Sequence, residues 1–196
     1  MTKENKKGKL FVVTGPSGVG KGTILNKFFQ NNRENICYSI SMTTRSPRPN
    51  EVDGVNYFFV TREEFIETVD NDGFLEWAEY SGNLYGTNKK FVNKRLDSGM
   101  NVLLEIETHG ALKVMEKFPN CVTIFFAPPD LAELEARLRG RHTEDEATIQ
   151  KRLNAVKSEL AVSDKYKHII INDEVEKALN KLQEIFDFET KEVNNE

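Results

Sequence analysis

Short apolar runs alternate with longer segments of helical spacing along most of this chain. The apolar runs occupy residues 10–14, 37–41, 101–106, 122–127 and 168–171. They are continuous rather than alternating with polar residues, as expected of parallel strands that are buried on both faces. The segments with helical spacing occupy residues 23–31, 108–117, 130–139, 143–163 and 174–188. The alternation predicts an α/β fold with a five-stranded parallel sheet flanked by helices.

Residues 42–98 interrupt this alternation. Pro47 and Pro49 stiffen a loop near the start of the segment, and a helical pattern begins at Arg62. Two short aromatic-rich runs flank that helix, at residues 55–60 and 74–80. Because aromatic residues are enriched in strands, we expect a small inserted α+β lobe here.

The helix starts and the domain limits follow from the same pattern. We expect a single domain over residues 1–196, with a core at about 9–41 and 99–190 and the inserted lobe at about 42–98. Three helix starts pair an oxygen acceptor with a glutamate three residues later, which is the spacing of a capping box. These pairs are Thr61 with Glu64, Asp130 with Glu133, and Thr143 with Glu146.

Composition narrows the function classes. The chain has 196 residues, of which 38% are hydrophobic and 30% charged, so it can bury a core and stay in solution. Its longest apolar runs are too short to cross a bilayer, and residues 1–9 are polar and basic with no apolar signal-peptide core after them. We therefore expect a cytoplasmic protein with no membrane partner. The sequence fits a monomer and a homo-oligomer equally.

Charge and cysteine usage add two expectations. The formal net charge of −4 gives no global attraction to nucleic acid, so a bound polyanion needs a local cluster of positive groups. Cys37 and Cys121 lie in apolar runs and lack metal-ligand spacing. We expect two reduced, buried thiols rather than a disulfide.

The glycine-rich segment after the first apolar run has the spacing of a phosphate-binding loop. Its residues are Gly15, Pro16, Ser17, Gly18, Val19, Gly20, Lys21, Gly22 and Thr23. Glycines let backbone N–H groups converge on phosphate oxygens, and the following helix adds its positive end. Lys21 supplies a point charge for the β- and γ-phosphates. A strand before and a helix after are the context that this loop requires, so we expect a bound nucleoside triphosphate.

Gly22 departs from the usual form of that loop. The position after the lysine usually holds Ser or Thr, whereas here the hydroxyl comes one residue later, at Thr23. We therefore expect Mg²⁺ to enter as Mg·ATP, held mainly by the ATP phosphates and water, with no metal ligand from the protein.

Arg45 and Arg48 lie three residues apart on a loop stiffened by prolines. Guanidinium groups match phosphate oxygens with two hydrogen bonds each, and a stiff backbone lowers the cost of ordering the loop. These two residues alone also fit a solvated basic loop.

Four collinear segments carry further motifs. They read SxSxTTRxPRPxExxGxxYxFV, FxEWAExxGNxYGT, VLLEIExxGA, and RLRGRxTExE followed by xxRL. In this respect the chain resembles the guanylate kinases from about Leu10 to Asp173, which is most of its length. The resemblance implies a P-loop nucleotide kinase with a core, a GMP-binding lobe and a helical lid at about 137–155. Such an enzyme transfers the γ-phosphoryl group of ATP to GMP, and we expect dGMP to be accepted as well.

The resemblance also implies roles for individual residues. The acceptor phosphate would be held by Arg45, Arg48 and Tyr57, with Tyr85 nearby. Guanine would be faced by Ser39, Glu76, Thr87 and Glu107. The transferring phosphoryl group would be clamped by Arg141 and Arg152, which act with Lys21 and Arg48 as the catalytic group. Adenine would lie beside Asn172.

The chemistry of guanine agrees with the role of Glu76. Guanine presents N1–H and an N2 amino group side by side, and one carboxylate can accept from both. Hydroxyl groups at Ser39 or Thr87 can donate to O6. Adenine lacks both donors, so AMP would leave a desolvated carboxylate unpaired. Sites of this kind reject the wrong substrate by factors on the order of 10⁴.

Several positions depart from the family pattern. Glu107 stands where the family commonly has Asp, His109 where Gln is usual, and His142 where Gly or Asn is usual. We assign no role to either histidine. Glu105 and Glu107 end an apolar strand, so either one orients the Mg²⁺ hydration shell, or both serve guanine or cap the next helix.

The expected mechanism is phosphoryl transfer by positioning and charge neutralisation. A GMP phosphate oxygen is largely deprotonated at neutral pH, so no general base is needed. The positive charge comes from the P-loop lysine, Mg²⁺ and the arginines around a lid that begins at Gly140. Three alternatives stay open: a non-catalytic guanylate-kinase-like module that binds a phosphorylated partner, a P-loop kinase for another acceptor, and an NTPase switch.

Overall fold

A computed structural model describes residues 7–31, 34–139 and 146–191. These residues form two compact units, which are described separately. The first unit comprises residues 7–12 and 34–121. The second comprises residues 13–31, 122–139 and 146–191.

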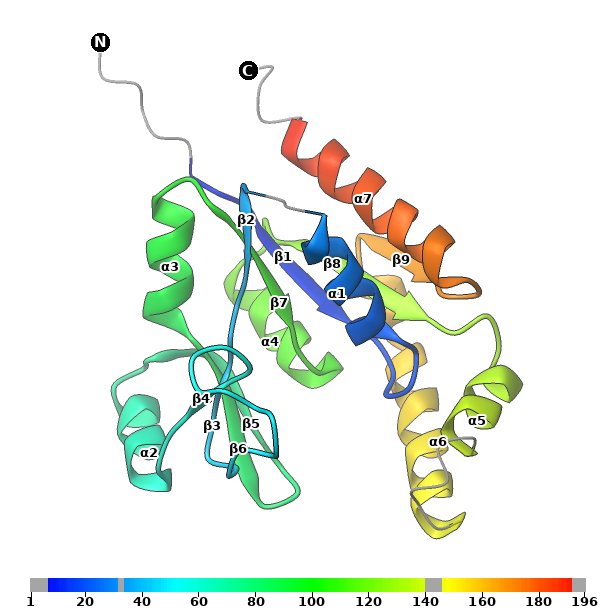
Figure 1. The fold of residues 1–196 in the computed structure, drawn as a ribbon, viewed down its shortest axis with the longest axis horizontal. Coiled ribbons are helices and arrows are strands. Elements are labelled where there is room, and N and C mark those ends of the chain that lie inside the picture. Colours follow the sequence, from blue (N-terminus) through cyan, green and yellow to red (C-terminus); the bar gives the residue numbers. More distant parts are fainter. Residues whose placement is uncertain (1–6, 32–33, 140–145, 192–196) are drawn as a thin grey trace. The chain divides into compact units, whose positions relative to one another are not determined.

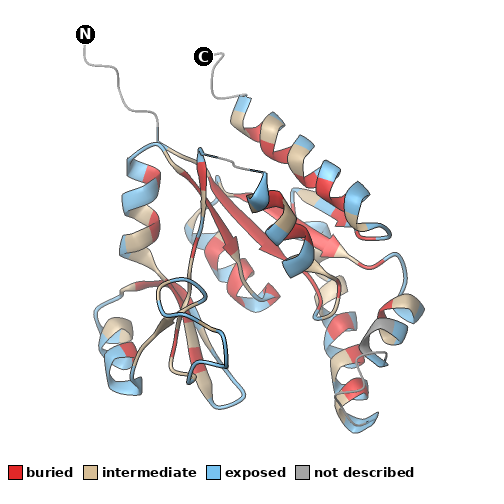
Figure 2. Ribbon diagram, in the orientation of Figure 1, coloured by how far each residue is buried: buried red, intermediate tan, exposed pale blue. Residues whose placement is uncertain are grey.

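Five strands form one sheet in the order β2-β7-β1-β8-β9 (Figure 1). Their bounds are β1 Leu10–Thr14, β2 Ile36–Tyr38, β7 Asn101–Glu105, β8 Val122–Ala127 and β9 His168–Ile171. Strand β2 pairs with β7, and β8 with β9, in parallel. Every residue of β1 is buried, and Figure 2 shows β1, β7 and β8 as mostly buried. The predicted five-stranded parallel sheet is therefore confirmed.

One predicted strand ends early. The run at 37–41 forms β2 only as far as Tyr38, although the Ser39 N–H still donates to the Leu103 carbonyl at 2.9 Å. The chain then joins a second sheet as β3, Met42–Thr43. Polar residues at Ser39 and Ser41 suit a departure from a sheet that is buried on both faces.

The second sheet belongs to the first unit and has the order β4-β3-β6-β5. Its other strands are β4 Phe58–Phe59, β5 Phe74–Tyr80 and β6 Asn83–Asn88. Helix α2, Arg62–Asp70, begins with the predicted capping box between Thr61 and Glu64. The core of this lobe is formed by Phe65, Phe74 and Leu84, and the first two rings stack at 4.4 Å. The inserted α+β lobe thus has its own core.

Three elements of the first unit, β3, β6 and α3, have no counterpart among the predicted ones. Strand β6 contains Gly86, where a Cβ would lie 2.8 Å from the Phe74 ring, so close packing replaces the apolar pattern. Helix α3, Lys89–Asp97, is mostly polar and buries only Val92 and Leu96. Strand β4 is shorter than the predicted run at 55–60. Helix α4, Thr108–Lys117, has the predicted bounds and packs against β5.

The second unit contains the remaining helices, which are α1 Lys21–Gln30, α5 Leu131–Arg139, α6 Glu146–Leu160, the short 3₁₀ helix Ser163–Lys165 and α7 Val175–Lys191. Helices α1 and α7 pack together, with the rings of Phe28 and Phe186 at 5.6 Å. Helices α5 and α6 share a cluster of Leu134, Ile149, Leu153 and Val156. The predicted Asp130 cap is present, since its carboxylate accepts from the Glu133 N–H at 2.7 Å. Thr143, the third predicted cap, lies outside the described residues.

The cysteines differ in part from the prediction. Cys37 and Cys121 are both free thiols, as expected, but each is only partly buried. Burial still raises the pKa of both thiols. Among the described helices, none combines the length and the apolar character needed to cross a bilayer.

Candidate active site

The glycine-rich loop, residues 15–23, links β1 to α1 in the second unit and has the backbone shape of an anion-binding loop. Gly15, Gly18 and Gly20 have φ values of 146°, 89° and 94°, in the left-handed region that favours glycine. A Cβ at Gly15 would lie 2.2 Å from the Phe126 carbonyl oxygen, so only glycine fits there. Gly20 caps α1 without a side chain, and the first turn of α1 carries no acidic residue. The positive end of the helix therefore faces this loop without a competing carboxylate from its own first turn.

Lys21 folds back over the loop. Its ammonium group donates to the Gly15 carbonyl and, at 3.1 Å, to the Pro16 carbonyl. Both bonds go to neutral backbone oxygens. These contacts hold the Lys21 ammonium group at the loop, and a phosphate oxygen is a stronger partner for an ammonium group than a neutral carbonyl.

Asn172 contacts the loop from the end of β9. Its side chain is 3% exposed and its amide donates to the Val19 carbonyl at 2.6 Å. A Cβ at Gly20 would lie 2.7 Å from the same amide nitrogen, which shows how closely the two segments pack. The predicted adenine-facing residue thus also braces the phosphate loop.

One of the two predicted lid arginines reaches the same loop. Arg152, on α6, donates to the Ser17 hydroxyl at 3.2 Å. Arg141, the other predicted clamp residue, lies outside the described residues together with Gly140 and His142. Arg139 instead pairs with Glu135 and Glu146, both within the second unit. Arg152 is therefore the described lid arginine that is placed at the phosphate loop.

Three of the predicted phosphate-binding side chains, those of Arg45, Tyr57 and Tyr85, form one cluster in the first unit. The Arg45 guanidinium donates to Glu51 at 2.9 Å and lies 5.4 Å from the centre of the Tyr57 ring. The rings of Tyr57 and Tyr85 meet edge to face at 6.1 Å. Burial raises the pKa of Tyr57, and Tyr85 adds to this effect, so its phenol stays a hydrogen-bond donor.

Sequence reasoning missed Glu51. Besides holding Arg45, its carboxylate accepts from the Arg48 backbone N–H at 2.7 Å, while the Arg48 side chain is exposed. One carboxylate therefore fixes the segment that carries both arginines. The signal was available, because Glu51 is the acidic position of the first motif.

Glu105 and Glu107 differ in their surroundings. The Tyr38 hydroxyl donates to Glu105 at 2.9 Å, and burial together with this carboxylate raises the pKa of Tyr38. Glu107 is exposed and occupies the position before α4 without making a side-chain capping bond. The capping alternative for Glu107 is therefore wrong.

Three of the four predicted guanine-facing residues, Ser39, Glu76 and Thr87, are buried, whereas Glu107 is exposed. Glu76 is 8% exposed, and the Thr87 hydroxyl donates to its carboxylate at 2.7 Å. A Cβ at Gly110 would lie 2.6 Å from the other carboxylate oxygen, so α4 approaches Glu76 closely. Burial raises the pKa of Glu76, while the Thr87 hydrogen bond acts in the opposite direction.

Ser39 completes this set with an unusual feature. It is 4% exposed, and within the described residues its hydroxyl oxygen has no hydrogen-bond partner. A buried polar group without a partner is costly, which is typical of groups that face a ligand.

The described residues contain no cluster of metal-binding side chains. No set of three or more His, Cys, Asp or Glu side chains among them could hold an ion. Thr23 is exposed, and a Cβ at Gly22 would meet nothing within 4 Å. This loop leaves space beside the expected phosphate position, which suits an ion that arrives with a nucleotide.

Comparisons with known proteins agree on one family. The family model described as guanylate kinase matches residues 7–189. A guanylate kinase of Halalkalibacterium halodurans is 50% identical over 93% of this chain and 89% of its own length. A guanylate kinase of Latilactobacillus sakei is 47% identical over 94% of this chain and 91% of its own. The crystal structure of guanylate kinase from Anaplasma phagocytophilum matches with a TM-score of 0.75 and 32% identity, over 94% and 87% of the two chains.

Proposed function

This chain belongs to the guanylate kinase family, and we propose that its two groups of site residues divide the work of transferring the γ-phosphoryl group of ATP to GMP. The products are ADP and GDP. The observation that carries the choice of acceptor is the buried Glu76 carboxylate, which accepts from Thr87 and lies in the same unit as the unpartnered Ser39 hydroxyl. We further propose that the enzyme works in the cytoplasm, where both nucleotides are found.

The donor site is formed by the phosphate loop. In our proposal its backbone N–H groups and Lys21 bind the ATP phosphates, and Asn172 holds the loop in shape while lying beside adenine. Arg152 is already directed at the loop through Ser17, which supports its contact with the transferring group. Arg141 is proposed as its partner.

Mg²⁺ fits this arrangement as part of Mg·ATP. It would neutralise negative charge on the ATP phosphates. A Cβ at Gly22 would meet nothing within 4 Å, and Thr23 is exposed.

The acceptor phosphate is assigned to the arginine–tyrosine cluster. Arg45 and Arg48 are proposed to bind its oxygens, with Tyr57 and Tyr85 donating from their phenols. Glu51 keeps the loop in place and balances the charge of Arg45 until the substrate arrives. An arginine that is held in place loses less conformational entropy on binding a phosphate.

Guanine is assigned to Glu76, Thr87, Ser39 and Glu107. An ionised Glu76 accepts from N1–H and the N2 amino group, and the two hydroxyl groups are available for O6. These residues are proposed to contact the guanine base, and none of them is assigned to the ribose 2′-hydroxyl. We therefore propose that dGMP is accepted together with GMP.

The chemical step then needs no general base. The nucleophilic oxygen of GMP is already largely deprotonated, so the protein must align the reactants and offset negative charge. Lys21, Arg48, Arg141 and Arg152 supply that charge in our proposal. Residues that exclude water also prevent hydrolysis of ATP, a side reaction that the same site could otherwise support.

A coupled ADP-release assay tests this proposal. With Mg·ATP, the chain should release ADP rapidly with GMP and dGMP and slower by factors on the order of 10⁴ with AMP, UMP or CMP. Lys21→Met should lower turnover at least about a hundredfold, whereas Lys27→Met, a change of the same type in α1 but outside the loop, should leave it nearly unchanged. Faster turnover with a non-guanine acceptor would refute the assignment of Glu76.

A further inference from the structure

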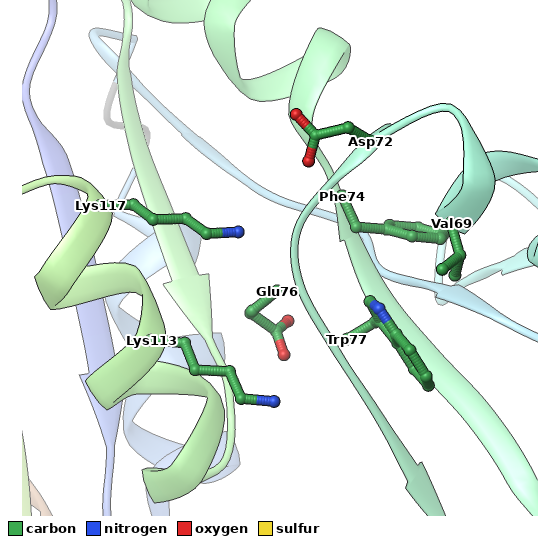
Figure 3. A pocket seen from close by; sticks show the side chains of 7 residues that line it. All are labelled: Val69, Asp72, Phe74, Glu76, Trp77, Lys113 and Lys117. Carbon is green, nitrogen blue, oxygen red and sulfur yellow. The ribbon is translucent and has the colours of Figure 1, made fainter.

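A pocket of about 210 Å³ lies in the first unit beside the proposed guanine-binding carboxylate (Figure 3). Its lining comes from α2, the following turn, β5 and α4, namely Val69, Asp72, Phe74, Glu76, Trp77, Lys113 and Lys117. Figure 3 shows the side chains of Lys113 and Lys117 extending from α4 toward the Glu76 carboxylate. Two positive groups therefore share the wall of the pocket with one nearly buried negative group.

The two lysines are not equivalent. Lys117 donates to the Leu75 carbonyl at 2.8 Å, so its ammonium group helps to join α4 to β5. Among the described residues, the Lys113 ammonium group makes no hydrogen bond or ion pair, and Lys113 is exposed at the pocket wall. Lys113 therefore acts on Glu76 mainly through its charge.

Glu76 needs such a charge in order to be ionised. Its described hydrogen-bond donor is the neutral Thr87 hydroxyl, and burial alone favours the protonated acid. The facing charged groups act in both directions. Lys113 and Lys117 favour the carboxylate, Glu107 opposes it, and Asp72, on the pocket wall, is paired with Lys89 of α3.

We propose that Lys113 is a positioning residue for guanine specificity, whose ammonium group keeps the Glu76 carboxylate ionised and directed at the base. The inference rests on the proposed function, because it takes Glu76 as the group that reads guanine. Nothing in the motif pattern singles out Lys113, since its role depends on the approach of α4 to β5.

The protonation state of Glu76 decides which purine it can bind. As a carboxylate it accepts both the N1–H and the N2–H of guanine. As a neutral acid it loses part of that acceptor capacity and gains an O–H that can donate to N1 of adenine. Lys113 therefore both strengthens GMP binding and weakens the competition from AMP.

The proposal predicts the direction in which KM for GMP changes with pH. Guanine recognition requires the ionised form, so KM for GMP should rise as pH falls through the pKa of Glu76. Without Lys113 that pKa is higher, and the rise should begin at a higher pH. Because Lys113 is exposed to solvent, we expect an effect of about three- to tenfold rather than more.

The test is a comparison of kcat and KM for GMP and AMP across the pH range from about 5.5 to 8.5. Lys113→Met removes the charge, Lys113→Arg keeps it, and Lys90→Met removes a lysine charge from the exposed surface of α3, outside the pocket. We expect Lys113→Met to raise KM for GMP about three- to tenfold near pH 6, with kcat changed less than twofold and the GMP/AMP preference reduced. Lys113→Arg and Lys90→Met should follow the wild-type profile.

Two results would overturn the inference. One is a Lys113→Met profile that superimposes on the wild type at every pH. The other is a rise in KM for GMP that is equal at all pH values and is also seen in Lys113→Arg, since this would indicate that Lys113 acts through packing rather than charge. Failure of the proposed function itself looks different, because the wild-type chain would then form no GDP from GMP.

Discussion

The Arg152 guanidinium donates a 3.2 Å hydrogen bond to the Ser17 hydroxyl, which joins helix α6 to the phosphate loop. The two residues are 135 positions apart in the sequence, so this contact places an arginine from the predicted lid at the loop. A guanidinium group held there can turn to phosphate oxygens with little rearrangement. Such an arrangement suits a group that acts in the transition state rather than in GMP binding.

Arg152→Ala should therefore impair turnover rather than acceptor binding. We expect kcat to fall about 10²–10³-fold and KM for GMP to change less than about threefold. Steady-state kinetics with both substrates varied will measure this. The exposed neighbour Lys151 provides a control, because Lys151→Ala removes a charge from the same helix turn. A rise in KM with unchanged kcat would argue against the clamp role of Arg152.

Asn172→Ala should weaken donor binding through the loop. The change removes the donor to the Val19 carbonyl and leaves that carbonyl buried without its bond. We expect KM for Mg·ATP to rise about tenfold, and KM for Mg·GTP to rise by a similar factor. Glu174→Gln, at an exposed site nearby, is the control. A selective loss for ATP would instead assign the amide to adenine alone.

Glu76→Gln should separate stability from specificity. Burial raises the pKa of Glu76, so keeping it ionised costs stability, and that cost grows as pH rises through the raised pKa. We expect the glutamine variant to be more stable than the wild type by about 1 kcal/mol near pH 8, with the difference vanishing in acid. Its kcat/KM for GMP should fall at least about a hundredfold. Urea unfolding at several pH values and GMP kinetics test both parts, with the exposed Glu79→Gln as control.

Glu189→Gln should have the opposite effect on stability. Burial raises the pKa of Glu189, but hydrogen bonds from Lys167 and His168 outweigh it, so the net pKa lies below the ordinary value. The ionised Glu189 therefore contributes to the free energy of unfolding above about pH 4.3, and this contribution is lost as pH falls through the lowered pKa. We expect Glu189→Gln to lower the free energy of unfolding by about 1–3 kcal/mol at neutral pH and by less in acid.

Urea unfolding at pH 7 and in acid measures that difference. Glu184→Gln, on the same helix, breaks an exposed pair with Lys181 and should cost less than about 0.5 kcal/mol. Equal losses in the two variants would contradict the role assigned to burial.

Gly15→Ala and Gly22→Ala form a matched pair in one loop. At Gly15 the added Cβ would lie 2.2 Å from the Phe126 carbonyl oxygen, and φ is 146°. We therefore expect Gly15→Ala to lower the free energy of unfolding by about 2–4 kcal/mol. At Gly22 there is open space and the residue is in the first turn of α1, so alanine should be neutral or stabilising by up to about 1 kcal/mol. Thermal unfolding of both variants measures the contrast. Similar melting temperatures would mean that the loop shape does not depend on Gly15.

Continuous apolar runs made the central sheet predictable. β1, β8, β9 and α4 have the predicted bounds residue for residue. For β1 and β8 the reason is that burial on both faces demands unbroken apolar sequence. Strand β6 and helix α3 escaped prediction for the opposite reason. Each buries only a few side chains, and their stability depends on neighbours rather than on a pattern of their own.

The residues of the candidate site also differ in whether the sequence could predict them. Motif residues such as Lys21, Arg45 and Glu76 could be named from the sequence, since their types and spacing match the chemistry of nucleotides. The contacts of Asn172 with Val19 and of Lys113 with the Glu76 pocket could not. They join segments that are distant in the chain, and no local periodicity records such a meeting.

The buried Ser39 hydroxyl has a consequence for the life of the protein between catalytic cycles. Among the described residues the Ser39 hydroxyl has no hydrogen-bond partner, so the segment that holds it is less stable when empty than when a purine is bound. Resistance of this segment to proteases should therefore track the supply of guanine nucleotides. The substrate would then act as a stabilising ligand of the enzyme that consumes it, and nucleotide starvation would shorten the lifetime of the enzyme.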